Sequence, residues 1–140
     1  MNPVLLAPVA AMAVVVLLAL GLRLQSVSQR RLVGRRATGA RHGVPHILAF
    51  TGASCTVCHV AQRPALARLR SDLTDLEVTE IDVAVQPETA RAYRVMTLPT
   101  TVVLDAEGRI SAVNTGFASE DLLRRQVADA LSHAAPATVA

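Results

Sequence analysis

The two cysteines of the chain, Cys55 and Cys58, are the feature that most narrows what this sequence can fold into. They follow the mostly apolar run 46–51 and precede a helix-compatible segment over 59–71. A strand, a CxxC pair and a helix in this order are the setting in which a dithiol carries out redox chemistry. At the start of such a helix, free backbone N–H groups and the helix dipole favour the Cys55 thiolate. Cys58 follows one turn later on the same face, where it can close a disulfide with Cys55 or resolve a mixed one.

The cysteine pair also allows other interpretations. The two cysteines can be buried and inert. A structural zinc site needs two further ligands at matched spacing, and the histidines are scattered, at His42, His46, His59 and His133. Residues 55–59 also spell CxxCH, the attachment pattern of c-type haem, for which Met96 is the only downstream methionine. Strands around the motif disfavour a helical cytochrome, so we expect a redox dithiol with no metal or cofactor and keep the haem protein as an alternative.

An uncharged run of Ala, Val and Leu occupies Val4 to Leu22 near the start of the chain. A helix of about 20 apolar residues is long enough to cross a bilayer. We therefore predict a transmembrane helix over 3–22. A cleaved signal peptide is the alternative, although residues 1–3 lack the basic charge that begins such peptides.

Arginines dominate the segment that follows, which we interpret as a basic juxtamembrane linker over 23–43. It contains six arginines and no acidic residue, at Arg23, Arg30, Arg31, Arg35, Arg36 and Arg41. The rest of the chain has eight arginines against eleven acids, so the basic character belongs to the linker and does not indicate a nucleic-acid-binding domain. Arginines near a membrane attract anionic lipid. The positive-inside rule predicts that the domain faces the cytoplasm, with an extracytoplasmic domain as the alternative.

The remaining chain predicts one α/β domain over 44–134, followed by a disordered tail over 135–140. The predicted elements are a strand over 46–51, a helix over 59–71 with a kink at Pro64, a strand over 77–85, a short helix over 88–93, a strand over 100–104, a turn over 105–108, a return strand over 109–115 and a last helix capped by Ser119. A helical crossover between the first two strands makes them parallel. The result is a four-stranded mixed sheet with helices on both faces.

This order of elements resembles the thioredoxin superfamily over roughly residues 45–133. Five features carry the resemblance: Cys55-x-x-Cys58, Asp82 at the end of the second strand, Tyr93 with Val95, Leu98-Pro99-Thr100, and the glycines Gly108 and Gly116 around the last strand. With the predicted membrane anchor, the chain is also similar to the anchored TlpA and MauD types. The resemblance implies a thiol–disulfide oxidoreductase whose catalytic residues and redox disulfide are Cys55 and Cys58. Its partners would be protein disulfide or dithiol substrates and an unidentified electron donor.

The resemblance also assigns a role to Leu98 and Pro99. In the family, the proline that matches Pro99 is cis and packs beside the dithiol, where it blocks metal capture by the thiolates. A cis bond there turns the Leu98 backbone toward the cysteines, so that its N–H and C=O can pair with an extended substrate. We therefore expect Leu98 and Pro99 to bind substrate.

Several departures from the family limit what the resemblance transfers. Ser54, a predicted helix N-cap, stands in place of the tryptophan before the first cysteine, and Ala49 stands in place of a buried aspartate. Pro64 comes six residues after Cys58 instead of five. The first strand and helix of a full thioredoxin have no clear counterpart. A thioredoxin-like adaptor without redox turnover therefore stays open as an alternative.

Overall fold

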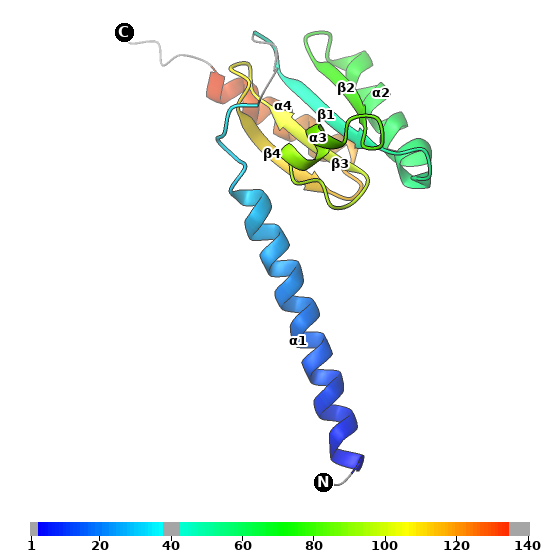
Figure 1. Ribbon diagram of the computed structural model, residues 1–140. Helices are drawn as coiled ribbons and strands as arrows, with labels where there is room; N and C mark the ends of the chain where they lie inside the picture. Colours follow the sequence, from blue (N-terminus) through cyan, green and yellow to red (C-terminus); the bar gives the residue numbers. More distant parts are fainter. Residues whose placement is uncertain (1–2, 38–42, 135–140) are drawn as a thin grey trace, which may run out of the picture. The chain divides into compact units, whose positions relative to one another are not determined.

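A computed structural model describes residues 3–37 and 43–134 (Figure 1). The chain divides into two compact units, Met1–Arg31 and Leu32–Ala140, and each is described by itself. The predicted disordered tail and the last part of the predicted linker lie outside the described residues.

The first unit contains one helix, α1, over Pro3–Arg30. The helix is longer than the predicted 3–22 and continues through the first arginines, because Arg, Leu and Gln are good helix formers. Within the described residues, the structure contains no helix that combines the length and the apolar character needed to cross a membrane. The predicted transmembrane assignment of 3–22 thus has no support from the structure.

The second unit is built on a four-stranded sheet. Its strands are β1 (His46–Thr51), β2 (Glu77–Asp82), β3 (Thr100–Leu104) and β4 (Ile110–Thr115). The spatial order is β2-β1-β3-β4, with β1 parallel to β2 and the other neighbouring pairs antiparallel. This confirms the predicted mixed sheet and its parallel first pair.

Helices cover both faces of this sheet, as predicted (Figure 1). Successive residues of a strand point to opposite faces, so Ile47 and Ala49 of β1 pack in one core and Leu48 and Phe50 in the other. The helices α2 (Arg63–Asp72) and α4 (Glu120–Ala134) cover the first core, and α3 (Pro87–Ala92) belongs to the second. The dithiol lies between the end of β1 and α2.

The folded unit begins earlier than predicted, at Leu32 and not at 44. We call residues 32–37 the strap. Leu32 is buried in the α3-side core, and the Gly34 N–H donates to the Ile110 carbonyl over 2.7 Å. In the sequence, the arginines and the glycine of the strap resemble a solvated tether, because its pairing with β4 is a contact between residues far apart along the chain.

Two local predictions are confirmed around β4. In the turn between β3 and β4, the Asp105 carboxylate accepts the N–H groups of Glu107 and Arg109, and Gly108 has a φ of 74°. A positive φ of this kind favours glycine. Before α4, the Ser119 hydroxyl accepts the Leu122 N–H over 3.3 Å, which is an N-cap contact.

Candidate functional site

The two cysteines form a disulfide, with an S–S distance of 2.12 Å and a Cα–Cα distance of 5.3 Å. The pair follows β1 directly, as the sequence predicts. Cys55 is partly exposed, whereas Cys58 is only 4% exposed. After reduction, one sulfur is therefore open to a large substrate and the other is shielded.

A backbone donor points at the more exposed sulfur. The Cys58 N–H donates to Cys55 Sγ over 3.2 Å. A hydrogen bond to sulfur favours the charged thiolate over the thiol. In the described structure the Ser54 hydroxyl makes no capping hydrogen bond, so the prediction of Ser54 as the N-cap is wrong. The Cys55 sulfur takes the place of a capping hydroxyl, because it accepts the Cys58 N–H.

A π-turn over Cys58–Gln62 joins the dithiol to α2. Its hydrogen bond runs from the Arg63 N–H to the Cys58 carbonyl, five residues back. A π-turn holds one residue more than the same stretch of α-helix, which explains why Pro64 comes six residues after Cys58. Pro64 is the second residue of α2, directly after the π-turn, and the predicted kink there stays a prediction.

Pro99 lies beside the dithiol. The Leu98–Pro99 peptide bond is cis, as the resemblance implies. Pro99 and Cys58 line the same small cavity, whose volume is about 10 Å³. Gly52 leaves room for the Leu98 side chain, since a Cβ built on the glycine would stand 3.0 Å from Leu98 Cδ1. The structure thus gathers all four predicted site residues; their predicted roles in catalysis and substrate binding stay predictions.

His59 has a backbone partner. Its Nε2 lies 3.3 Å from the Ala53 carbonyl oxygen. A role of His59 in favouring the thiolate was an open possibility in the sequence, and this contact gives it a backbone partner instead. Among the described residues, no group of three or more His, Cys, Asp or Glu side chains is placed to hold a metal ion.

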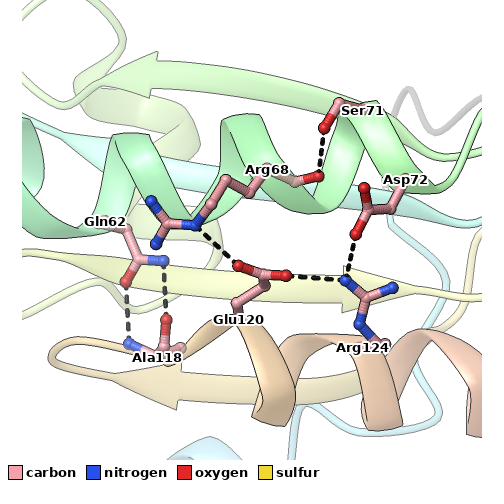
Figure 2. Close-up of polar contacts among 7 residues, drawn as sticks. All are labelled: Gln62, Arg68, Ser71, Asp72, Ala118, Glu120 and Arg124. Atoms are coloured by element: carbon pink, nitrogen blue, oxygen red, sulfur yellow. Dashed lines mark hydrogen bonds and ion pairs between the residues drawn. The ribbon is translucent and has the colours of Figure 1, made fainter.

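Gln62 is a buried site residue that the sequence reasoning missed. Its side chain donates to the Ala118 carbonyl over 3.1 Å and accepts the Ala118 N–H over 2.9 Å, as Figure 2 shows. These two bonds fix the end of the π-turn to the loop before α4. The π-turn gave no sequence signal beyond the spacing between Cys58 and Pro64.

An ion-pair network also joins α2 to α4 (Figure 2). Glu120 binds Arg68 over 2.9 Å and Arg124 over 2.8 Å, and Arg124 binds Asp72 over 2.7 Å. The hydrogen bond from Arg68, followed by that from Arg124, lowers the pKa of Glu120 below its usual value. The network thus ties α2, which follows the π-turn of Cys58, to α4.

A second arginine–carboxylate pair, Arg63 with Glu80, lies on the β2 side of the site. Arg63 Nε donates to Glu80 Oε1 over 3.0 Å, and Arg63 Nη2 donates to Oε2 over 2.6 Å. The bidentate geometry fixes the orientation of the carboxylate. Both side chains line the cavity that Cys58 lines.

Several solved structures share this fold. Thioredoxin-2, a component of the malaria parasite protein secretion machinery, is 19% identical with a TM-score of 0.59, and the match covers 68% of this chain and 99% of that one. A thioredoxin from Fasciola hepatica is 24% identical with a TM-score of 0.57, covering 64% and 84% of the two chains. Mitochondrial thioredoxin 3 from Saccharomyces cerevisiae, in its oxidized form, is 21% identical with a TM-score of 0.55, covering 74% and 88%.

Sequence comparisons add the family. A search of curated proteins finds no match. The family model for thioredoxin matches residues 40–129, which is more than half of the chain and spans the dithiol, the cis proline and all four strands. The chain therefore belongs to the thioredoxin family.

Proposed function

We propose that this protein is a thiol–disulfide oxidoreductase that reduces or exchanges protein disulfides through Cys55 and Cys58. The observation that carries the proposal is the asymmetry of the disulfide: Cys55 is partly exposed and accepts a backbone N–H, whereas Cys58 is buried one turn further. An exposed thiolate can attack a substrate, and a shielded thiol beside it can only react with what is bound to its neighbour.

In the reducing direction, the Cys55 thiolate attacks one sulfur of a substrate disulfide. The substrate S–S bond breaks, its other sulfur leaves and takes up a proton, and a mixed disulfide forms on Cys55. The Cys58 thiolate then attacks Cys55 Sγ, which closes the Cys55–Cys58 disulfide and releases the second substrate thiol. Two electrons pass to the substrate, and a dithiol donor of unidentified nature returns the protein to its reduced form.

Leu98 and Pro99 are proposed to hold the substrate chain during this exchange. Pro99 lines the cavity of the buried sulfur, and Leu98 contacts the turn that follows β1. The Leu98 backbone would pair with an extended segment on either side of the substrate cysteine.

Insulin reduction with dithiothreitol as donor tests the enzyme directly. We expect the full-length protein to precipitate insulin faster than dithiothreitol alone, and both Cys55→Ser and Cys58→Ser to lose this activity. Cys58→Ser should trap mixed disulfides that dithiothreitol releases, whereas Cys55→Ser should trap none. No insulin reduction and no adduct with either variant would favour the adaptor.

The residue that reacts first can be found by labelling. Brief treatment of the reduced protein with iodoacetamide at neutral pH, followed by mass mapping, should modify Cys55 before Cys58. Preferential labelling of Cys58 would reverse the assigned roles. A redox titration then gives the direction, because a potential near about −270 mV favours reduction and one near about −120 mV favours oxidation.

The haem alternative does not fit the residues around CxxCH. The cavity beside Cys58 has a volume of about 10 Å³, whereas sites for ligands of drug size measure about 300–1,000 Å³. Met96, the methionine considered as an axial ligand, is 80% exposed. Purified protein without a Soret band would agree with this.

Where the domain works is a separate proposal, and it rests on the sequence. The uncharged run 4–22 and the arginines after it favour a single-pass membrane anchor, contact with anionic lipid and a cytoplasmic domain. The anchored TlpA and MauD types suggest the opposite side. Alkaline phosphatase fused after Ala140 separates the two, since activity in whole cells would place the domain outside.

A further inference from the structure

The Cys58 thiol has to lose its proton before it can attack the mixed disulfide, because the thiolate is the nucleophile. Cys58 is only 4% exposed, and burial disfavours a charged thiolate. Bulk water therefore has poor access to this proton. A proton acceptor inside the site would relieve the restriction.

We propose that Glu80 is this acceptor and takes the Cys58 proton through the cavity that both side chains line. The inference rests on the proposed function, since it concerns the second step of disulfide exchange. Besides Cys58, the ionisable side chains that line the cavity are Glu80 and Arg63. A guanidinium has no acceptor atom and keeps its proton in proteins, which leaves the carboxylate.

The sheet register places Glu80 beside Ala49, on the face that α2 covers. Glu80 of β2 is paired with Ala49 of β1, and Thr51 lies two residues further along β1. Residues two apart on a strand point to the same face, so Thr51 faces the same side as Ala49, toward the core that α2 covers. Cys58, the first residue of the π-turn, lines the same cavity as Ala49, Thr51 and Glu80.

Arg63 holds the carboxylate and is itself tied to the dithiol. Its guanidinium forms the bidentate pair with Glu80, and its backbone N–H donates to the Cys58 carbonyl. One residue thus connects the proposed acceptor to the proton donor. The Glu80 side chain is also 41% exposed, so a proton taken from the cavity can pass on to solvent.

The cavity is the right size for a relay. Its volume of about 10 Å³ is at the lower limit of what holds one water molecule. The Thr51 hydroxyl, which also lines it, is buried and has no hydrogen-bond partner among the described residues. A water bound by Thr51 and Glu80 would carry the proton between Cys58 Sγ and the carboxylate.

The step balances without a further reagent. The Cys58 proton moves to Glu80, the Cys58 thiolate bonds to Cys55 Sγ, and the bond from Cys55 to the substrate sulfur breaks. The substrate sulfur leaves with the electron pair of that bond. It takes up a proton from solvent, to which Glu80 releases the Cys58 proton, so the carboxylate is regenerated.

Stopped-flow reaction of the reduced full-length protein with the aromatic disulfide DTNB separates the two steps. The first thionitrobenzoate is released when Cys55 attacks, and the second when Cys58 resolves the mixed disulfide. We expect Glu80→Gln to leave the first phase unchanged and to slow the second about 100-fold at pH 7, the lower end of general-base effects. The second phase of the variant should accelerate as pH rises from 6 to 9, and Glu80→Asp should recover most of the wild-type rate.

The control is Glu88→Gln on α3, which also removes an exposed carboxylate paired with an arginine, Arg91, but does not line the Cys58 cavity. Both of its phases should equal those of the wild type. Equal second phases in Glu80→Gln and wild type, with the same pH profile, would overturn the role of Glu80 and leave the proposed function intact. A wild-type protein that releases no second thionitrobenzoate would instead defeat the proposed function.

Discussion

Gln62→Ala is the substitution whose cost can be worked out most directly from the structure. Gln62 is 3% exposed, and its two hydrogen bonds satisfy both the N–H and the carbonyl of Ala118. Each buried polar group left without a partner costs about 1–3 kcal/mol, so the two together lower the free energy of unfolding by about 2–5 kcal/mol after partial relief by water.

Gln126→Ala is the matched control, because Gln126 also makes two side-chain hydrogen bonds, both to Asn114 over 2.8 Å. Gln126 and Asn114 are only partly buried side chains. Asn114 keeps its bond to the Thr101 hydroxyl over 3.1 Å, and water can replace the bonds that Gln126 made, so we expect a loss of about 0.5–1.5 kcal/mol.

Urea unfolding followed by circular dichroism measures both losses, with unchanged slopes showing that the folded and unfolded states are otherwise the same. The reasoning fails if Gln62→Ala costs no more than Gln126→Ala. In that case the π-turn would be held by its apolar contacts, and the bonds to Ala118 would be incidental.

Three further changes test other parts of the structure. Val60 is 69% exposed within the π-turn, and deleting it leaves the Arg63 N–H four residues after the Cys58 carbonyl, which is α-helical spacing. The turn should then become α-helical, with a free energy of unfolding within about 1 kcal/mol of the wild type. An unfolded variant in circular dichroism would contradict this. Burial raises the pKa of Tyr93, whose hydroxyl has no hydrogen-bond partner in the described part of the chain. Because Tyr93 ionises at lower pH in the unfolded chain than in the folded one, wild-type stability should fall as pH rises above about 10. In urea titrations, Tyr93→Phe should show a smaller fall above about pH 10 and should be no less stable than the wild type at pH 7. The pKa of Glu120 is lowered in the folded protein, so its ion pairs stabilise the fold fully above the unfolded pKa of about 4.3, and this stability is lost as pH falls through the folded pKa. Thermal melts at several acidic pH values should therefore show a smaller loss of stability with falling pH for Glu120→Gln than for the wild type.

Local signals in the sequence were enough to predict most of the sheet and the dithiol. The spacing of Cys55 and Cys58, the run before them and the turn at 105–108 each act over a few residues, and the structure confirms all three. The cis bond at Pro99 followed from the resemblance. The second strand was predicted too long, over 77–85, because Val83 and Val85 continue the alternation after β2 has ended at Asp82.

The sequence predictions failed at residues whose role depends on contacts with distant parts of the chain or on the local backbone geometry. Leu32 looked like one apolar residue in a basic linker, and only its place in the core shows that it belongs to the fold. Gln62 and Glu80 carry no motif, and their importance depends on a π-turn and on strand register. Ser54 had the right residue type for a cap, but the neighbouring sulfur took the N–H group.

The strap has a consequence for association between chains during folding. The order of the sheet leaves β4 as an edge strand, and unpaired edges recruit strands from other chains. By pairing with Ile110, the strap occupies the start of that edge with the chain's own backbone. A protein cut between the strap and β1 would keep the dithiol and the sheet but present an open edge. Its first defect would be intermolecular association that grows with concentration.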